Sequence, residues 1–418
     1  MTTSQEYRDV NSTVRNRRWA TLAVAGAMLA AVVTGTAGSA AAAPAPAAVT
    51  ATASGAALPP VDREAVRQVV AGYPTADING VLVRVAGSDG LFETSGGIGD
   101  RTTGAAPDPE GRFRIGSISK VFTATVVLQL AAEHRLDVNG TVQQYLPGLL
   151  PADFPPVTVG QLLNHTSGLP HGSSGAWGDG TTAWFAAHRL DSWTPEQIVG
   201  TLAGQQMIFA PGTGQQYNGF NTFIAGLLIE KVTGHSYAHE VKHRIIQPLH
   251  LRDTAVPDRD DPRLADPAAH AYLNVPDADG AGRLVDVTEQ SPWPWAEGGL
   301  ISSAPDLDRF VTALFQGRLL PAAQQELLFT VPEVPNVDNP QCRPGQQQAC
   351  MSMGLVSTEL NGVTLWGKTG SRPGWTSGVF ATRDLQRRLV YSFNPTNTQG
   401  ADMRDILRLA DAVIPPAR

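Results

Sequence analysis

Hydrophobic and polar positions alternate near both ends of the chain, whereas the middle of the chain carries long apolar runs. The segment INGVLVRVAG (78–87) alternates like a strand with one buried face. Residues 362–370, 375–383 and 387–393 have the same character, and Asn361-Gly362 ahead of them is typical of a tight hairpin turn. The pattern predicts an antiparallel sheet formed by both chain ends.

The middle of the chain predicts helices. Residues 120–136 and 221–234 are apolar nearly all round, which is typical of buried helices, and Gly234 is suited to end the second one. Residues 403–414 have the spacing of an amphipathic helix. We therefore expect an α+β fold, in which helices flank the sheet and a mainly helical subdomain is inserted between its two halves.

The first 43 residues predict an export signal, because a start containing Arg17-Arg18 precedes an apolar run (19–33) and a series of small residues. An uncleaved membrane anchor is the alternative, although the apolar run is short for a span. The arginine pair leaves the export route, general or twin-arginine, open. We expect a secreted protein without stable membrane insertion after cleavage.

Two further segments follow the predicted signal. Residues 44–60 are rich in Ala and Pro without an apolar period, so they predict a flexible linker. Residues 61–418 show no internal repeat and predict one catalytic domain, which we expect to be a monomer.

The net charge and the cysteine content limit the classes of partner and compartment that suit this chain. Removal of residues 1–43 takes away four Arg, one Glu and one Asp, so the formal net charge changes from −7 to −9. An acidic chain is a poor partner for nucleic acid or an anionic membrane surface. Cys342 and Cys350 bracket RPGQQQA, and in an exported protein they predict a small disulfide loop. A two-cysteine half of a zinc site is the alternative.

Lysine is rare in this chain, since only four of its 31 basic residues are Lys. Ser117 and Lys120 in RIGSISK are three apart, so both side chains lie on one face of a helical turn. The lysine can accept the serine proton or orient the hydroxyl, and free N–H groups at a helix start can hold an oxyanion. A second lysine, Lys368, begins Lys-Thr-Gly at a predicted strand end, where the glycine allows a ligand to approach the backbone.

The stretch HEVKH (239–243) suggests a different hypothesis, catalysis by a zinc ion. His239, Glu240 and His243 have the spacing of a zinc peptidase, with two imidazoles on one helical face and a general base beside them. The apolar positions Tyr237 and Val241, however, define the opposite face as the buried one. We interpret HEVKH as a surface helix and keep zinc catalysis as the weaker alternative.

Several long motifs resemble the serine β-lactamase superfamily, most closely its secreted actinobacterial D-alanyl-D-alanine carboxypeptidases. These motifs are GSISKVFTATVVLQL, LLNHTSGLP, PGTGQQYNGFNTFIAGLLIEKVTGHS, AEGGLISSAPDLDRF and GKTGSRPGW. The resemblance extends from about residue 78 to about residue 410. It implies a β-lactamase/transpeptidase-like fold and acyl transfer through an acyl-serine, without a metal or cofactor.

The resemblance also implies roles for individual residues. Ser117 would be the nucleophile, Lys120 would support its deprotonation, and Tyr217 would pass the proton to the leaving amine. The backbone N–H groups of Ser117 and Ser371 would hold the oxyanion. The substrate-binding residues implied are Lys368, Thr369, Gly370, Ser371 and Trp293.

Two departures from the family pattern concern substrate binding. The tyrosine motif reads Tyr-x-Asn in the family, but Gly219 stands at the third position here, so that Asn218 or Asn221 would have to reach in. The carboxylate-binding arginine before the Lys-Thr-Gly motif is also absent. Arg372 is the candidate replacement, provided that the turn at Pro373-Gly374 brings it over the cleft mouth.

These observations predict a secreted, penicillin-sensitive serine peptidase that hydrolyses peptidoglycan stem peptides ending in D-Ala-D-Ala. An esterase or a β-lactamase on the same fold remains open, because fold and nucleophile do not determine the acyl donor. A catalytically weak penicillin-binding-like protein remains open as well. The expected ligands are a D-Ala-D-Ala-terminated peptide or a β-lactam.

Overall fold

The computed structural model describes residues 57–172, 178–277 and 279–416. The predicted export signal and most of the predicted linker lie outside these ranges. No helix within them is both long enough and apolar enough to cross a membrane.

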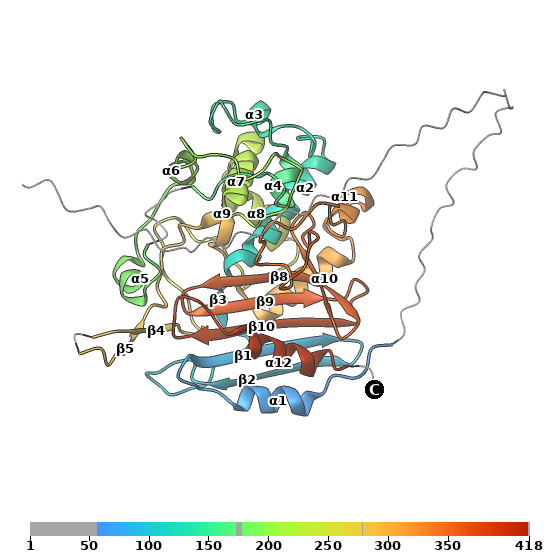
Figure 1. Ribbon diagram of the computed structural model, residues 1–418. Helices are drawn as coiled ribbons and strands as arrows, with labels where there is room; N and C mark the ends of the chain where they lie inside the picture. The colour runs from blue at the N-terminus through green and yellow to red at the C-terminus, as the bar shows by residue number, and fades with distance from the viewer. Residues whose placement is uncertain (1–56, 173–177, 278, 417–418) are drawn as a thin grey trace, which may run out of the picture. The chain divides into compact units, whose positions relative to one another are not determined.

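The centre of the fold is a six-stranded antiparallel sheet in the order β2-β1-β10-β9-β8-β7 (Figure 1). Its strands are β1 (Ile78–Gly87), β2 (Gly90–Gly97), β7 (Val356–Leu360), β8 (Val363–Arg372), β9 (Trp375–Ala381) and β10 (Arg387–Pro395). Both chain ends therefore build one sheet, as predicted. Two small ribbons lie outside it and pair β3 (Arg112–Arg114) with β6 (Ile301–Ser303) and β4 (Tyr272–Val275) with β5 (Arg283–Asp286).

The helices are mostly inserted between β2 and β7, as the apolar runs predict. They are α1 (Arg63–Ala71), α2 (Ser119–Ala132), α3 (Val142–Tyr145), α4 (Val159–Leu163), α5 (Thr182–His188), α6 (Pro195–Gly200), α7 (Phe220–Thr233), α8 (Tyr237–Val241), α9 (Trp295–Gly298), α10 (Ala304–Phe315), α11 (Ala322–Leu327) and α12 (Met403–Val413). A 3₁₀ turn (Gly116–Ile118) leads into α2, and a π-helical turn (Lys242–Ile246) follows α8.

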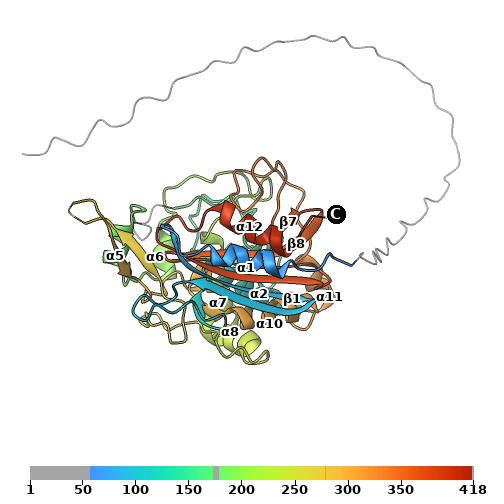
Figure 2. The ribbon, with the colours of Figure 1, turned by 90° about the horizontal axis from the view of Figure 1, so that it is seen from below.

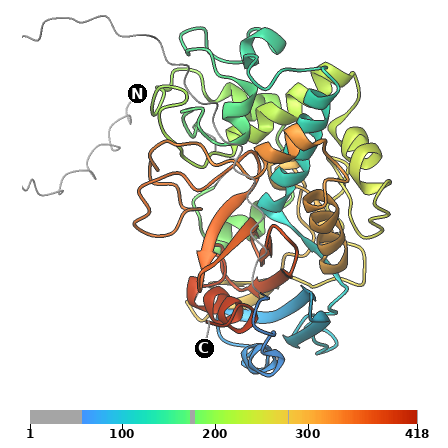
Figure 3. The same cartoon turned by 90° about the vertical axis from the view of Figure 1, so that its right-hand side faces the viewer.

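Helices cover both faces of the sheet because successive strand residues point to opposite sides. Leu82 of β1 belongs to the large core on the side of α2, α7 and α10, whereas Val81 and Val83 pack with α1 and α12. Figure 2 shows α1 and α12 lying across one face, and Figure 3 shows the sheet edge-on between them and the other helices. The sheet thus forms the middle of three layers.

The two longest inserted helices are buried, as predicted from their uniform apolarity. Eleven residues of α2 and ten of α7 are buried, and Gly234 ends α7 in the left-handed conformation. The hairpin prediction is confirmed too, since Asn361 and Gly362, both with positive φ, join β7 to β8. The predicted disulfide between Cys342 and Cys350 is present.

A shared carboxylate links α10 to the sheet. Asp308 accepts hydrogen bonds from Arg84 of β1 at 3.0 Å and from Arg388 of β10 at 2.5 Å. The Asp308 side chain is only 8 % exposed, so the carboxylate lies largely outside bulk water. Removal of one partner from such a network leaves charges that are buried and uncompensated.

Asp308→Ala should lower the free energy of unfolding by about 2–4 kcal/mol, because it leaves two half-buried guanidinium groups without this carboxylate. Urea unfolding followed by circular dichroism measures the change. Glu326→Ala is the matched control, since it breaks an exposed ion pair with Arg383 and should cost less than about 1 kcal/mol. Equal losses in the two variants would contradict a special role for the Asp308 network.

Candidate active site

The predicted nucleophile lies on a short turn that touches the end of strand β8. Gly116, at φ +50°, precedes Ser117, and a Cβ at Gly116 would lie 2.6 Å from the backbone nitrogen of Ser371. A Cβ at Gly370 would lie 1.9 Å from the carbonyl oxygen of Ile115. Only glycine fits at both positions. The Ser117 turn and the Lys-Thr-Gly motif are therefore in direct backbone contact.

Lys120 lies one turn further along, at the start of α2, and bonds to the nucleophile. Its Nζ donates to Ser117 Oγ at 3.0 Å, to the carbonyl oxygen of Glu297 at 2.7 Å and to the carboxylate of Glu297. Burial alone would lower the pKa of Lys120, but the Glu297 carboxylate and Tyr217 outweigh it, so the pKa is raised. Lys120 is therefore held as an ammonium ion.

Tyr217 lies between the two lysines of the site. Lys120 Nζ is 5.1 Å and Lys368 Nζ is 4.7 Å from the centre of its ring. Burial raises the pKa of Tyr217, and nearby Lys120 opposes that effect. The hydroxyl has no partner within hydrogen-bonding geometry among the described residues, although Ser117 and Lys120 lie close enough to influence its pKa. Tyr217 is free to bond to a substrate or to relay a proton.

His165 supports Tyr217 from behind as a neutral ring. Burial lowers the pKa of His165 well below its ordinary value, and both lysines add to that effect. Its Nδ1 accepts from the backbone N–H of Asn218 at 3.2 Å and faces the amide of Asn221 at 3.0 Å. The ring centres of His165 and Tyr217 are 4.7 Å apart. His165 is thus a structural histidine whose ring nitrogen is satisfied by hydrogen bonds.

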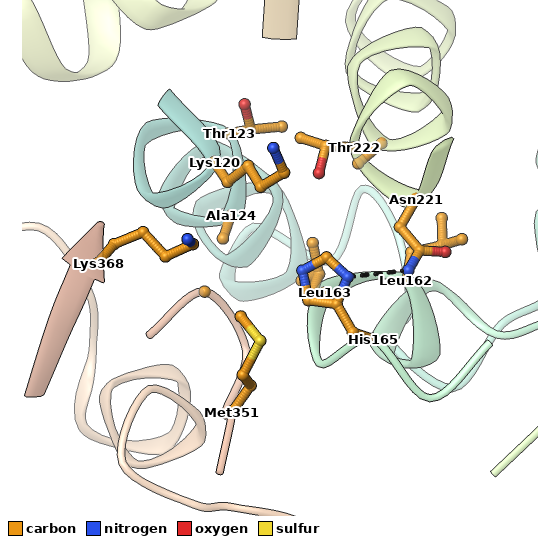
Figure 4. Close-up of a pocket in the computed structure, with 12 residues that line it drawn as sticks. Lys120, Thr123, Ala124, Leu162, Leu163, His165, Asn221, Thr222, Met351 and Lys368 are labelled. Atoms are coloured by element: carbon orange, nitrogen blue, oxygen red, sulfur yellow. Dashed lines mark hydrogen bonds between the residues drawn. The ribbon is translucent and has the colours of Figure 1, made fainter. Parts of the chain in front are cut away.

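A cavity of about 10 Å³ lies beside these groups, enough for about one water molecule. Figure 4 shows Lys120 from α2 and Lys368 from β8 at this cavity, together with the bond between His165 and Asn221. Lys368 is fully buried, and its pKa is lowered well below its ordinary value by burial and by the charge of Lys120. The cavity lies inside the protein and includes neither Ser117 nor Ser371, so it is not the substrate cleft.

Glu297 fills the place that Gly219 leaves open, a feature that the sequence analysis did not predict. A Cβ at Gly219 would lie 3.0 Å from Glu297 Oε1 and 3.2 Å from Glu297 Cγ. The residue that bonds to Lys120 therefore comes from α9 instead of from the tyrosine motif. The signal was present in AEGGLISS, where an acidic residue stands in an otherwise apolar run.

Neither of the asparagines considered as replacements reaches the nucleophile. The amide of Asn218 donates to the carbonyl oxygens of Leu169 and Pro170 at 2.7 and 3.0 Å. Asn221 accepts from Ser167 Oγ at 2.7 Å and lies against His165. Both are fully used within the loop, so the predicted substrate contact of Asn218 does not form in this structure.

Arg372 also differs from its predicted pose over the cleft mouth. Its guanidinium is buried and donates to the carbonyl oxygen of Ser291 at 3.1 Å. Burial lowers the pKa of Arg372 to about 10. The alternation along β8 turns Arg372 inward, whereas Ser371 is exposed. Trp293, the predicted aromatic wall, is half-buried and lies parallel to Phe223 of α7 at 6.4 Å.

The HEVKH segment lies on the surface, as predicted, with one difference. His239 and His243 are exposed, while Tyr237 and Val241 are buried. Glu240 is buried as well and bonds to Arg244, so it is not poised as a general base. His235, His239 and Glu240 lie close enough together to hold a metal ion, but only the two histidines are exposed, and the Glu240 carboxylate is bonded to Arg244.

The comparisons with known proteins agree with this geometry. The model of the family described as beta-lactamase matches residues 64–413, which is most of the chain. This chain belongs to the beta-lactamase family. A solved D-stereospecific amidohydrolase from Streptomyces sp. is 32 % identical, with a TM-score of 0.71, over 85 % of this chain and 99 % of that one.

Curated relatives of the family are more distant and match only in part. Penicillin-binding protein 4* of Bacillus subtilis is 28 % identical over 60 % of this chain and 55 % of its own length. Esterase EstB of Burkholderia gladioli is 28 % identical over 54 % of this chain and 62 % of its own length. The family is thus established. The names of these two relatives refer to different activities, penicillin binding and ester hydrolysis.

Glu297→Gln should move the acidic limb of the kcat/KM profile to lower pH. Glu297 raises the pKa of both Lys120 and Tyr217, so its neutralisation lets either candidate base lose its proton at lower pH. A pH series from 5 to 10 measures the shift, which we expect to be about one pH unit or less. Glu289→Gln, at an exposed position nearby, is the control. Superimposable profiles for Glu297→Gln and wild type would contradict this coupling.

The double variant His239→Ala with His243→Ala should keep full hydrolytic activity, because both side chains are exposed, on α8 and on the π-helical turn after it, outside the Ser117 site. Steady-state kinetics with and without a chelator provide the measurement. A large loss in the double variant, together with loss of wild-type activity on chelation, would favour the zinc alternative in place of serine catalysis.

Proposed function

We propose that this beta-lactamase family member is an acyl-serine amidohydrolase that cleaves small amides or peptides of D-amino acids with a free α-amino group. The observation that carries the proposal is the Glu297 carboxylate beside the nucleophile. In the family motif this space belongs to a neutral asparagine; here it belongs to an acid. The D-configuration is supported by the likeness to the Streptomyces D-stereospecific amidohydrolase.

Glu297 has the geometry to bind a second cation. Its Oε1 bonds to Lys120, while Oε2 has no hydrogen-bond partner among the described residues. The side chain is 16 % exposed, so the carboxylate is shielded but reachable. A charge-assisted bond to an ammonium group in such surroundings is stronger than a neutral one. A substrate with a free α-ammonium next to its scissile carbonyl supplies that cation.

The proposed reaction uses Ser117, Lys120 and Tyr217. Ser117 Oγ attacks the amide carbonyl, and its proton passes through the Lys120–Tyr217 pair to the leaving amine as the C–N bond breaks. The backbone N–H groups of Ser117 and Ser371 face the developing oxyanion. Water then attacks the acyl-serine, which releases the D-amino acid and returns the proton to Ser117.

A D-alanyl-D-alanine carboxypeptidase, which the sequence predicted, is the second candidate. The hydroxyls of Thr369 and Ser371 at the accessible end of β8 favour it, because they can donate to a terminal carboxylate. The buried position of Arg372 speaks against it, because the carboxylate would lack a guanidinium partner. An esterase is a further candidate, because ester hydrolysis needs the same nucleophile, Ser117.

We further propose that the protein is exported and acts outside the cytoplasm as a monomer. The export signal predicted over residues 1–43 supports secretion, and the Cys342–Cys350 disulfide fits an oxidising compartment.

The test compares D-alaninamide with N-acetyl-D-alaninamide and with L-alaninamide. Wild type should hydrolyse D-alaninamide best, because only this substrate has both the free ammonium and the D-configuration. Glu297→Gln should lower the preference for the free amine over the N-acetyl substrate by about 10-fold or more. Ser117→Ala should hydrolyse none of them.

The outcomes separate the candidates. A wild type that prefers the N-acetyl substrate, or a preference that survives Glu297→Gln, would contradict ammonium binding by Glu297. Hydrolysis of D-Ala-D-Ala peptides far above that of D-alaninamide would favour the carboxypeptidase. Activity retained by Ser117→Ala would overturn the nucleophile itself.

A further inference from the structure

Gln341 bonds to the side chains of both Lys368 and Thr369 in the Lys-Thr-Gly motif. Its amide oxygen Oε1 accepts from Lys368 Nζ at 2.7 Å and from Thr369 Oγ1 at 2.9 Å. The side-chain nitrogen of Lys368 and the hydroxyl of Thr369 converge on one position, where a carboxylate oxygen could accept the same two hydrogen bonds. In this structure, that position is taken by a residue of the protein itself.

The loop that carries Gln341 is held in place from several sides. The backbone N–H of Gln341 donates to Asn339 Oδ1 at 3.0 Å, and the neighbouring Cys342 is in the disulfide with Cys350. Gln215, which is fully buried, accepts from the backbone N–H of Cys350 at 2.9 Å and of Met351 at 3.0 Å. The side chain of Gln341 is therefore presented to Lys368 by a constrained loop.

The same buried glutamine connects this loop to the catalytic tyrosine. Gln215 stands two residues before Tyr217, and its backbone N–H donates to the carbonyl oxygen of Pro335 at 2.9 Å. Tyr217 in turn packs against the cluster that contains both cysteines. The loop and the proton-relay residue form one unit, so the position of Gln341 relative to the Ser117 site is well defined.

The electrostatics of Lys368 suit a neutral partner. Lys368 is buried, and its pKa is lowered well below the ordinary value by burial and then by Lys120. Burial and a nearby like charge disfavour the charged form of Lys368, and its N–H groups still need a hydrogen-bond acceptor. The amide oxygen supplies one without bringing a charge into the site.

From these contacts we infer that Gln341 is a specificity-determining residue that occupies the carboxylate position of the cleft and restricts the enzyme to leaving groups without a terminal carboxylate. The inference rests on the proposed amidohydrolase function and deepens it. A neutral carboxamide leaves Gln341 in place, whereas a carboxylate must displace its amide oxygen from both Lys368 and Thr369. A D-aminoacyl amide is accepted on this basis, and a D-aminoacyl-D-alanine is disfavoured.

The experiment uses a substrate pair that differs only at the C-terminus, D-alanyl-D-alanine and D-alanyl-D-alaninamide. Wild type should prefer the alaninamide. Gln341→Ala should move the ratio of the two kcat/KM values toward the free carboxylate by about 10- to 100-fold, because it vacates two donors. Most of the change should be in KM for D-alanyl-D-alanine, with kcat on the alaninamide little altered.

Three further variants sharpen the result. Gln341→Glu places a carboxylate on the same donors, so the preference for the alaninamide should persist or increase. Gln348→Ala truncates an exposed glutamine of the same disulfide loop and should leave the ratio at the wild-type value. Gln341→Ser serves as a second truncation if Gln341→Ala does not fold. An unchanged ratio in a folded truncation, or an equal shift in Gln348→Ala, would overturn the inference.

A second measurement keeps this inference separate from the proposed function. N-acetyl-D-alanine and N-acetyl-D-alaninamide compete against hydrolysis of p-nitrophenyl acetate, which requires only the nucleophile. Gln341→Ala should lower the inhibition constant of the carboxylate at least about 10-fold relative to that of the carboxamide. If wild type hydrolyses neither D-alaninamide nor the two dipeptides, the proposed function fails, while this comparison still decides the role of Gln341. Equal inhibition constants in wild type and variant would refute it.

Discussion

The close backbone contact between strand β8 and the turn that carries Ser117 is the constraint on which the rest of the site depends. A side chain at Gly370 would overlap the carbonyl of Ile115, and a side chain at Gly116 would overlap the backbone of Ser371. Because the two segments touch without intervening atoms, the sheet and the helical region act as one rigid support. The nucleophile on the 3₁₀ turn before α2 and the substrate-binding strand from the C-terminal half are thus held together through glycine.

The two lysines of the site have different hydrogen-bond partners. Lys120 has a carboxylate beside it and stays protonated, whereas the acceptors of Lys368 within the described ranges are the neutral oxygens of Gln341 and Thr369. Two buried lysines near one tyrosine would repel each other if both were charged. The Glu297 carboxylate raises the pKa of Lys120, whereas burial and the charge of Lys120 lower the pKa of Lys368. Chemistry at Ser117 therefore depends on α9, an element of four residues that is far from Ser117 along the chain.

Much of the fold could be predicted from the sequence, because its periodicities were strong and local. The alternating strands at both ends, the two buried helices and the Asn361-Gly362 hairpin reflect the conformational preferences of neighbouring residues. Ser117 and Lys120 could be paired for the same reason, since one helical turn separates them. The positions of Lys368 and Tyr217 came from motif resemblance, and the structure brings both to Lys120.

The features that could not be predicted all depend on contacts between distant segments. Glu297 bonds to Lys120, which is 177 positions away along the chain, and Gln341 bonds to Lys368, which is 27 positions away. Gln341 also lies in an irregular loop, whose sequence has no periodic pattern from which its position could be predicted. The pose of Arg372 was misjudged for a different reason. The turn at Pro373-Gly374 begins only after Arg372, so the strand alternation still governs the direction of its side chain.

Gly219 and Glu297 compete for one volume, and this makes the two positions genetically interdependent. An asparagine at position 219 meets the carboxylate of Glu297, while a small residue at 297 with glycine retained removes the carboxylate that bonds to Lys120. Each single exchange is therefore expected to be harmful, although the two together restore a filled and neutral arrangement. Proteins with Gly219 and Glu297 and proteins with an asparagine at position 219 would therefore be separated by a loss of fitness. Neither pair of residues can be reached from the other by single substitutions that are each harmless.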